Sequence, residues 1–315
     1  MSLRAYYSVF HHLSQLSMKY FKVNYVPSSV KAEANIIEWK QQKWFEYIEH
    51  IYREFLFGDQ NVSKYFQHDQ KQKFYSLSKT LYENMQHCLE ENCSYVTYCD
   101  SYYPPNLRFL DDCPYGLFAM GDLRTLDDPC FSIVGSRKSN PFAINQSRDL
   151  GMLLAQRGYT IVSGGAFGCD IAAHLGVLAA NLQPVPAIVV YAGGLDCIYP
   201  RGNARVFDEI KEKNGIFLTE KLWMTEVKPY YFPIRNRIIS GISKVTIVID
   251  ASLKSGALNT ARNALDQGRE VWVLKPQNHS LTSEGIEHLI LDGALSFNNA
   301  YDLLNNYDLD HFIRG

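Results

Sequence analysis

The chain has 315 residues, 46% of them hydrophobic and 20% charged, enough for one large or two ordinary domains with a full core. Its formal net charge is −2, which excludes the diffuse basic excess of proteins that coat nucleic acid. No apolar run reaches the ~18–20 residues of a membrane helix, and the first residues lack a signal-peptide layout. The seven cysteines form no Cys-x-x-Cys pair. We therefore expect a cytoplasmic globular protein with free thiols.

Residues 1–92 are predicted to form a small helical domain whose function the sequence does not indicate. Trp44, Ile48, Ile51 and Phe55 recur at the spacing of one helix face. Residues 93–130 contain Pro104-Pro105 and several acidic turns, a pattern typical of extended or turn segments. We expect this stretch to be a connector that contains a strand and packs on the domain that follows.

Residues 131–315 alternate short apolar segments with helical patterns, which predicts a doubly wound, mostly parallel Rossmann-like α/β sheet. One predicted helix has a buried face made of Ala143, Ser147, Leu150 and Leu154, and another has one made of Leu258, Ala261 and Leu265. The predicted strands are Phe131–Val134, Thr160–Ser163, Ala187–Tyr191, Ile216–Thr219, Val245–Asp250 and Glu270–Leu274.

In sheets of this kind, ligands bind at the carboxyl ends of the strands, so the loops there are the candidate sites. Four of these loops carry glycines and small polar residues beside a predicted helix start, where backbone N–H groups can hold an anion. Together they predict a wide site for a nucleotide or a polyanion. The candidate residues in these loops are Gly135, Ser136, Arg137, Lys138, Ser163, Gly164, Gly165, Arg201, Asn203, Ser255 and Gly256.

The segment Tyr231–Gly241 places Arg235, Asn236 and Arg237 around one turn before the fifth strand. Arginine suits phosphate because its planar fork donates paired hydrogen bonds. The alternative is a helix face held by ion pairs, in which Arg235 or Arg237 is structural and pairs with an acid such as Asp196.

Sequence motifs for catalysis are missing: the chain has no phosphate loop for a nucleoside triphosphate, no zinc helix and no nucleophile elbow. His174 lies in a helical pattern without metal ligands at the right spacing, so we interpret it as a packed or capping residue. Asp170 and Asp196 stand beside glycine turns and are more typical of caps and turn formers. We expect neither a cofactor nor a metal, and no enzymatic activity.

The chain resembles the DNA-processing protein A (Smf) family of bacterial transformation and recombination over residues ~100–300. The resemblance rests on Val134–Lys138, Ser163-Gly164 with Gly168 and Asp170, Gly194–Asp196 with Tyr199-Pro200, Phe232-Pro233 with Arg235–Arg237, Ser255-Gly256 with Thr260, Gly268–Val271, and Tyr103–Pro105. It implies a homodimer that binds single-stranded DNA without sequence preference and helps to load the RecA recombinase. It also implies that Arg137, Ser163–Gly165, Arg201 and Arg235–Arg237 line the DNA pocket.

Several positions depart from the family pattern. Phe167 stands where the family usually has arginine, and Glu287 where an asparagine is common. The missing arginine would weaken a phosphate pocket, whereas a phenylalanine there could stack on a base.

Two other functions remain open from the sequence. The first is a nucleoside-monophosphate phosphoribohydrolase on a related fold, whose Gly-Gly-x-Gly-Thr turn and glutamate would correspond to Ser255–Thr260 and Asn263. An amide cannot act as a general base, which argues against this enzyme. The second is an accessory factor that has lost DNA binding, because of Phe167 and Glu287.

Overall fold

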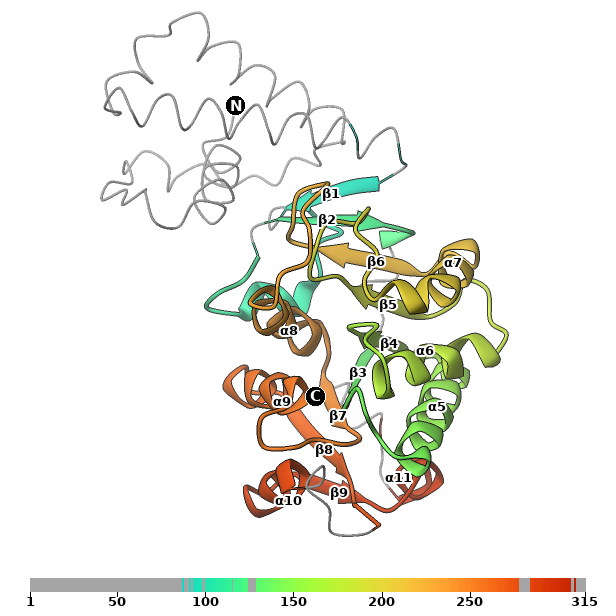
Figure 1. Cartoon of the computed structure of the whole chain (residues 1–315), viewed down its shortest axis with the longest axis vertical. Helices are drawn as coiled ribbons and strands as arrows, with labels where there is room; N and C mark the ends of the chain where they lie inside the picture. The colour runs from blue at the N-terminus through green and yellow to red at the C-terminus, as the bar shows by residue number, and fades with distance from the viewer. Residues whose placement is uncertain are drawn as a thin grey trace, which may run out of the picture. The chain divides into compact units, whose positions relative to one another are not determined.

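The computed structural model in Figure 1 describes residues 93–97, 100–114, 116–123, 129–277 and 284–306, together with the single residues 87, 91 and 309. The backbone contacts divide the chain into two compact units. The first contains residues 1–103 and 114–118, and the second contains residues 104–113 and 119–315. The helical domain expected at residues 1–92 lies outside the described residues, apart from residues 87 and 91. Within the described part, no helix combines the length and apolar character needed to span a bilayer.

The second unit is built on a parallel β-sheet. The strand order within this unit is β6-β5-β4-β3-β7-β8-β9, and every neighbouring pair among these strands is parallel. Along the chain, β4, β5 and β6 are therefore added in turn on one side of β3, and β7, β8 and β9 are then added on its other side. The strands are β1 (Cys93–Thr97), β2 (Gly116–Met120), β3 (Cys130–Val134), β4 (Thr160–Ser163), β5 (Ala187–Val190), β6 (Ile216–Thr219), β7 (Val245–Val248), β8 (Glu270–Leu274) and β9 (Leu295–Phe297).

Helices cover both faces of this sheet, as Figure 1 shows. One layer holds α5 (Pro141–Gln156), α6 (Cys169–Ala179), α7 (Ala204–Glu212) and α11 (Ala300–Asn306). The other holds α8 (Tyr231–Ile242), α9 (Gly256–Asp266) and α10 (Glu284–Leu291). Burial on both faces explains why the central strands are continuously apolar instead of alternating, since β3 to β7 contain no exposed residue. The doubly wound α/β fold predicted from the sequence is confirmed.

Local sequence signals fix where two of the helices begin. Asn140 precedes α5 and its Oδ1 accepts a hydrogen bond from the Ala143 amide at 2.9 Å, while Pro141 occupies the first helical turn. Ser255 precedes α9 in the same way, and its Oγ accepts from the Leu258 amide at 3.2 Å. Both helices thus start directly after a strand-end loop and direct their N-terminal N–H groups toward the sheet edge that carries those loops.

The short 3-10 helix η2 (Pro105–Phe109) fixes the position of α8 within the second unit. The Asn106 side chain donates to the Ile242 carbonyl at 2.9 Å, and Arg269 donates to the Asn106 carbonyl at 3.1 Å. Gly241 lets α8 approach η2 closely, because a Cβ at Gly241 would lie 2.6 Å from Leu110. One part of the expected connector, η2, therefore holds α8 in position.

All six predicted strands are found, three of them with their predicted bounds, and the differences are local. The first begins one residue earlier, at Cys130, and the third ends at Val190 and not at Tyr191. The fifth predicted strand ends at Val248 and not at Asp250, so Ile249 and Asp250 belong to the loop. The α5 face is buried as expected, but Leu265 of α9 is 48% exposed and Ala264 is buried instead. Ala264 is too small to stand out in a periodicity analysis. The expected connector contains two strands, β1 and β2, and not one.

Candidate nucleic-acid interface

The strand-end loops meet at one edge of the sheet because β3 to β9 run parallel. The strand order reverses between β3 and β7, which is the position where open α/β sheets bind ligands. The loops after β3, β4 and β5 and the start of α8 lie on one side of this point. The loops after β7 and β8 lie on the other side.

Asp170 connects the loops that follow β3 and β4. Its carboxylate accepts from the Gly135 amide and the Ala166 amide, each at 3.4 Å, and the side chain is 6% exposed. Burial raises the pKa of Asp170, whereas the nearby Arg235 guanidinium and the hydrogen bonds from Ala166, Gly135 and Gly164 lower it. Asp170 is thus a buried turn former, as its position beside a glycine turn predicted.

Arg235 is buried under the β4 loop and does not reach the surface. Its Nη1 donates to the Gly164 carbonyl at 3.1 Å and to the Val190 carbonyl, and its Nε donates to Asn236 at 3.2 Å. Gly164 is required there, since a Cβ at this position would lie 2.5 Å from the guanidinium. Burial, partly offset by Asp170, lowers the pKa of Arg235 to about 10. The guanidinium therefore holds the β4 and β5 loops together.

Arg237 is also engaged in structural contacts. Its Nη2 lies 2.6 Å from Oε1 of Glu220, and its Nε lies 3.2 Å from Oδ2 of Asp112. The structural alternative is therefore right for Arg237, but the suggested partner Asp196 is wrong. Asp196 accepts from the Met224 amide at 2.8 Å instead. The sequence could not single out Glu220, because it lies 17 residues away in the chain.

The remaining small polar candidates lie at the predicted loops, and most of their side chains are occupied. Ser163 is fully buried and donates to the Ile133 carbonyl at 2.7 Å. Asn203 donates to the Gly165 carbonyl at 2.9 Å. Asn236 donates to Gly256 at 3.2 Å, and Ser255 caps α9. Ser136 accepts from the Lys138 amide at 3.2 Å. These groups shape the loops, and the phosphate contacts available to a ligand must come from other groups.

Three of the candidates are exposed cations, namely Arg137, Lys138 and Arg201. The Arg137 guanidinium lies over the Phe232 ring, 4.9 Å from its centroid. Tyr199 contacts the same ring at a centroid distance of 5.6 Å. Stacking on Phe232 limits the rotamers of Arg137, so less entropy is lost when the guanidinium binds an anion.

A second exposed ring, Phe167, lies beside this group. A Cβ at Gly202 would lie 3.0 Å from the Phe167 ring, next to Arg201. Gly168 adopts φ +81°, and a Cβ there would lie 2.9 Å from the Arg137 backbone, so the Phe167 turn abuts the Arg137 loop. Phe167 is 48% exposed and Tyr199 is 44% exposed. We call Arg137, Phe167, Tyr199, Arg201 and Phe232 the aromatic–arginine surface.

Sequence reasoning did not include Tyr199 and Phe232 among the site residues. An aromatic residue in the same strand-end loop as a glycine turn is the signal that could have identified Tyr199. The contact between Tyr199 and Phe232 joins residues 33 positions apart, and only the fold brings them together.

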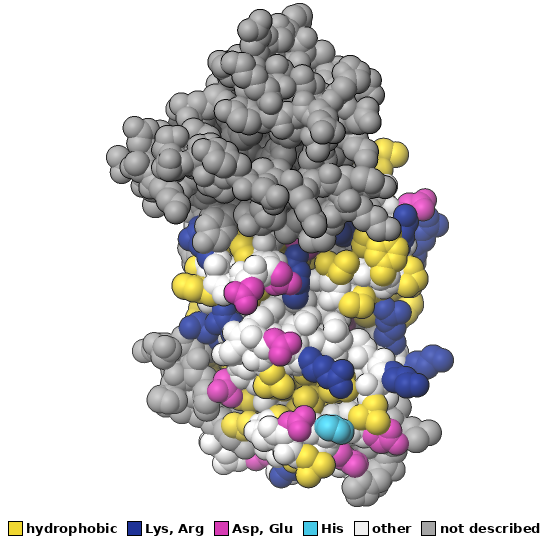
Figure 2. Space-filling view, turned by 90° about the vertical axis from the view of Figure 1, so that its left-hand side faces the viewer, with side chains coloured by type: hydrophobic (Ala, Val, Ile, Leu, Met, Phe, Trp, Pro, Cys, Tyr) yellow, Lys and Arg dark blue, Asp and Glu magenta, His cyan; other side chains and the backbone are white. Residues whose placement is uncertain are grey.

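Charge of both signs occurs on the face that Figure 2 shows. Figure 2 views the side of α8, α9 and α10, where acidic side chains are scattered and several basic side chains gather toward the right-hand edge of the view. With a net charge of −2, this leaves local clusters such as the aromatic–arginine surface as the means of attracting a polyanion.

The enzymatic candidates show no catalytic arrangement in the described part of the chain. His174 is fully buried in α6 and neither ring nitrogen has a hydrogen-bond partner, and burial lowers its pKa to about 4. It is a packed histidine, as expected. Asn263, the position compared with a catalytic glutamate, lies in the middle of α9. Within the described residues, no group of three or more His, Cys, Asp or Glu side chains could hold a metal.

Comparison with known proteins shows where this architecture recurs. Residues 94–308 match the family described as DNA recombination-mediator protein A. Protein Smf of Escherichia coli is 38% identical over 75% of this chain and 63% of its own length, so the chain spans less than two thirds of that relative. DNA processing protein DprA of Streptococcus pneumoniae is 31% identical over 84% of this chain and 92% of its own.

Two solved structures are similar to the fold. The X-ray structure of DprA from Streptococcus pneumoniae has a TM-score of 0.66, with 26% identity over 87% of this chain and 100% of that one. DNA processing protein A from Helicobacter pylori, described as having a unique single-stranded DNA binding mode, has a TM-score of 0.61 with 32% identity. That match covers 69% of this chain and 97% of the other.

Proposed function

Because the chain belongs to the DNA recombination-mediator protein A family, we propose that it binds single-stranded DNA at the aromatic–arginine surface. The observation that carries this proposal is the contact between Arg137 and Phe232 at the end of β3, with Tyr199 against the same ring. Cations next to exposed rings are the combination by which proteins hold single strands, since phosphates and base faces are offered together. The single-stranded DNA binding described for the Helicobacter pylori relative supports it.

Each component has a defined part in this proposal. Arg137, Lys138 and Arg201 are exposed and neutralise phosphates. Phe167 and Tyr199 offer ring faces on which bases stack, at roughly 1–3 kcal/mol per base. Phosphate contacts and stacking carry no sequence information, so binding is independent of base sequence. Phe167 thus replaces an electrostatic contact by a stacking contact.

The buried residues Arg235 and Asp170 hold the aromatic–arginine surface in its geometry. Arg235 and Asp170 join the loops after β3, β4 and β5, which present Arg137, Phe167 and Tyr199. A surface held in its binding geometry before DNA arrives loses little conformational entropy on binding. This accounts for the burial of Arg235, which the sequence analysis expected to line the DNA pocket.

Three finer parts of the proposal rest on the family resemblance. They are that the protein acts as a homodimer, that it helps to load RecA onto the bound strand, and that it holds DNA without cleaving it. Sedimentation would report the dimer, and RecA filament formation on protein-coated single strands would report loading. Shortening of an end-labelled strand by the purified protein would contradict the third part.

Competition with unlabelled DNA tests the central proposal. The aromatic–arginine surface needs unstacked bases, so a single strand should displace a labelled oligo-dT at a much lower concentration than a duplex of equal length. Arg137→Ala should weaken binding, whereas the control Arg157→Ala should not, because Arg157 ends α5 at the opposite edge of the sheet. Equal competition by duplex and single strand would contradict the proposal.

A further inference from the structure

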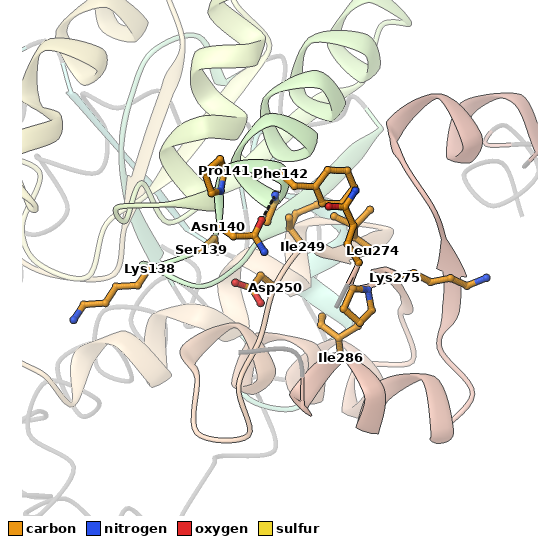
Figure 3. A pocket seen from close by; sticks show the side chains of 13 residues that line it. Lys138, Ser139, Asn140, Pro141, Phe142, Ile249, Asp250, Leu274, Lys275 and Ile286 are labelled. Atoms are coloured by element: carbon orange, nitrogen blue, oxygen red, sulfur yellow. Dashed lines mark hydrogen bonds between the residues drawn. The ribbon is translucent and has the colours of Figure 1, made fainter. Parts of the chain in front are cut away.

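A cavity of about 530 Å³ lies at the strand-order reversal itself, at the carboxyl ends of β3, β7 and β8. This volume lies within the range of ~300–1,000 Å³ typical of small-molecule sites. Figure 3 shows its lining side chains, which come from the loop after β3, the ends of β7 and β8, the start of α5, and α10. None of the residues of the aromatic–arginine surface lines it.

Asp250 is the distinctive residue of this cavity. It lies just beyond the end of β7, is 6% exposed, and stands among the labelled side chains of Figure 3. Its Oδ2 is buried and receives no hydrogen bond from the protein. Burial raises the pKa of Asp250, opposed by hydrogen bonds from Ser139 and the Ala251 amide. A buried carboxylate oxygen without a donor is costly, so this atom is poised to accept a hydrogen bond from a ligand.

The rest of the lining indicates what kind of ligand carries that donor. Phe142, Ile249 and Ile286 provide apolar surface for a flat ring. Asn140 uses its side-chain oxygen to cap α5, which leaves its amino group as a donor beside Asp250. Lys138 and Lys275 are exposed and project from opposite sides of the cavity in Figure 3, where they can meet phosphate. The lining therefore fits an apolar ring with polar edges that is joined to an anion.

We propose that this cavity binds a nucleotide whose base carries an exocyclic amino group, with that group donating to Asp250 and the phosphate directed to Lys138 or Lys275. Cytosine, adenine and guanine have such a group and thymine does not. The nucleotide is either free in solution or one unit of a bound strand, since both present the same base edge and phosphate. The cavity contains no residue of the aromatic–arginine surface and shares only Lys138 with the cations proposed to contact DNA, so the contact of the base with Asp250 does not depend on the function proposed above.

Calorimetric titration of the full chain with the monophosphates dCMP, dAMP, dGMP and dTMP tests this inference. The three amino-bearing nucleotides should bind more tightly than dTMP. Asp250→Asn keeps the shape of the side chain but replaces an acceptor by a donor, and it should weaken their binding about tenfold or more. Asp266→Asn is the matched control, because it removes the same charge from an exposed position on α9 and should change nothing.

Two further measurements locate the phosphate and the source of the nucleotide. Lys275→Ala should weaken dCMP but leave deoxycytidine, which has no phosphate, unchanged. If the ligand is free, dCMP should bind equally with oligo-dT present; if it belongs to a strand, Asp250→Asn should weaken oligo-dC but not oligo-dT. Failure of oligo-dT to bind at all would contradict the function proposed above and leave the monophosphate titration intact.

Three results would overturn the cavity assignment. The first is dTMP binding as tightly as the other three nucleotides. The second is equal binding of the nucleotides by the wild type and Asp250→Asn. The third is no binding of any monophosphate together with unchanged oligo-dC affinity in Asp250→Asn.

Discussion

The salt dependence of DNA binding distinguishes the cations that touch DNA from those that hold the fold. Arg235 and Arg237 are engaged within the protein, which leaves Arg137, Lys138 and Arg201 exposed at the strand ends. Each phosphate neutralised on a single strand contributes about −0.7 to the slope of log affinity against log salt, so three contacts give a slope of about −2.1. Arg137→Ala should reduce it to about −1.4.

The assay is a fluorescence-anisotropy titration of oligo-dT between 50 and 200 mM salt. With a slope of about −2.1, affinity should fall about 18-fold across this range, and with a slope of about −1.4 only about sevenfold. Arg157→Ala should keep the wild-type slope. A slope near −2.8, the value for about four contacts, would show that a further cation reaches the DNA. A folded Arg137→Ala variant with the wild-type slope and affinity would refute the assigned position of the strand.

In the same salt titration, Arg235→Ala serves as the comparison with Arg137→Ala, because Arg235 is buried and Arg137 is exposed. Its removal leaves the carbonyls of Gly164 and Val190 without their donor and Asp170 without its nearby cation, in a buried setting. Breaking a buried charge pair costs about 3–5 kcal/mol of unfolding free energy, so urea should unfold this variant at a clearly lower concentration. At temperatures where the variant stays folded, its salt slope should equal that of the wild type. A stable variant with a flatter slope would mean that Arg235 contacts DNA after all.

Two further predictions concern the buried charges of the fold. Arg237→Ala should lower the unfolding free energy by about 3–5 kcal/mol, because Glu220 is left buried without its partner. Asp112→Ala should lower the unfolding free energy by less than about 1 kcal/mol, since the Asp112 side chain is 65% exposed. Equal losses in urea titrations would contradict this ranking. His174 has a pKa of about 4 when folded, against about 6.5 when unfolded, so its neutral form stabilises the fold above pH 6.5 and this stability is lost as the pH falls toward 4. Between pH 7 and pH 5 the unfolding free energy of the wild type should fall by about 2 kcal/mol through this histidine, and this contribution should be absent in His174→Leu. Parallel profiles of unfolding free energy against pH for the two proteins would contradict this role of His174.

The two sides of the strand-order reversal carry different chemical groups and suit different ligands. On the β3–β4–β5 side, rings and cations lie at an exposed surface, which suits a flexible polymer whose bases and phosphates are both accessible. On the β7–β8 side, a buried carboxylate lies in a half-open cavity, which suits one small group that can be desolvated. Lys138 lies between the two, one residue after Arg137 and in the lining of the cavity.

The amino-acid sequence alone determined the fold class, the six strands β3 to β8 and the edge of the sheet at which to look. Apolar runs such as Ile216–Thr219 and glycines at strand ends are local signals, because burial on both faces and tight turns each require particular residues at particular positions. The sequence also identified Arg137 and Arg201 as exposed loop cations.

The tertiary structure decided which of the polar residues face a ligand. Arg137 and Arg235 look alike in the sequence, yet the first is exposed on Phe232 and the second is buried against the carbonyls of Gly164 and Val190. The difference depends on where α8 packs, and η2, more than 100 residues earlier in the chain, fixes that position. The unsatisfied oxygen of Asp250 likewise appears only when the loop after β3, the end of β7 and α10 come together. Burial and hydrogen-bond partners are properties of contacts between distant segments, and no local pattern encodes them.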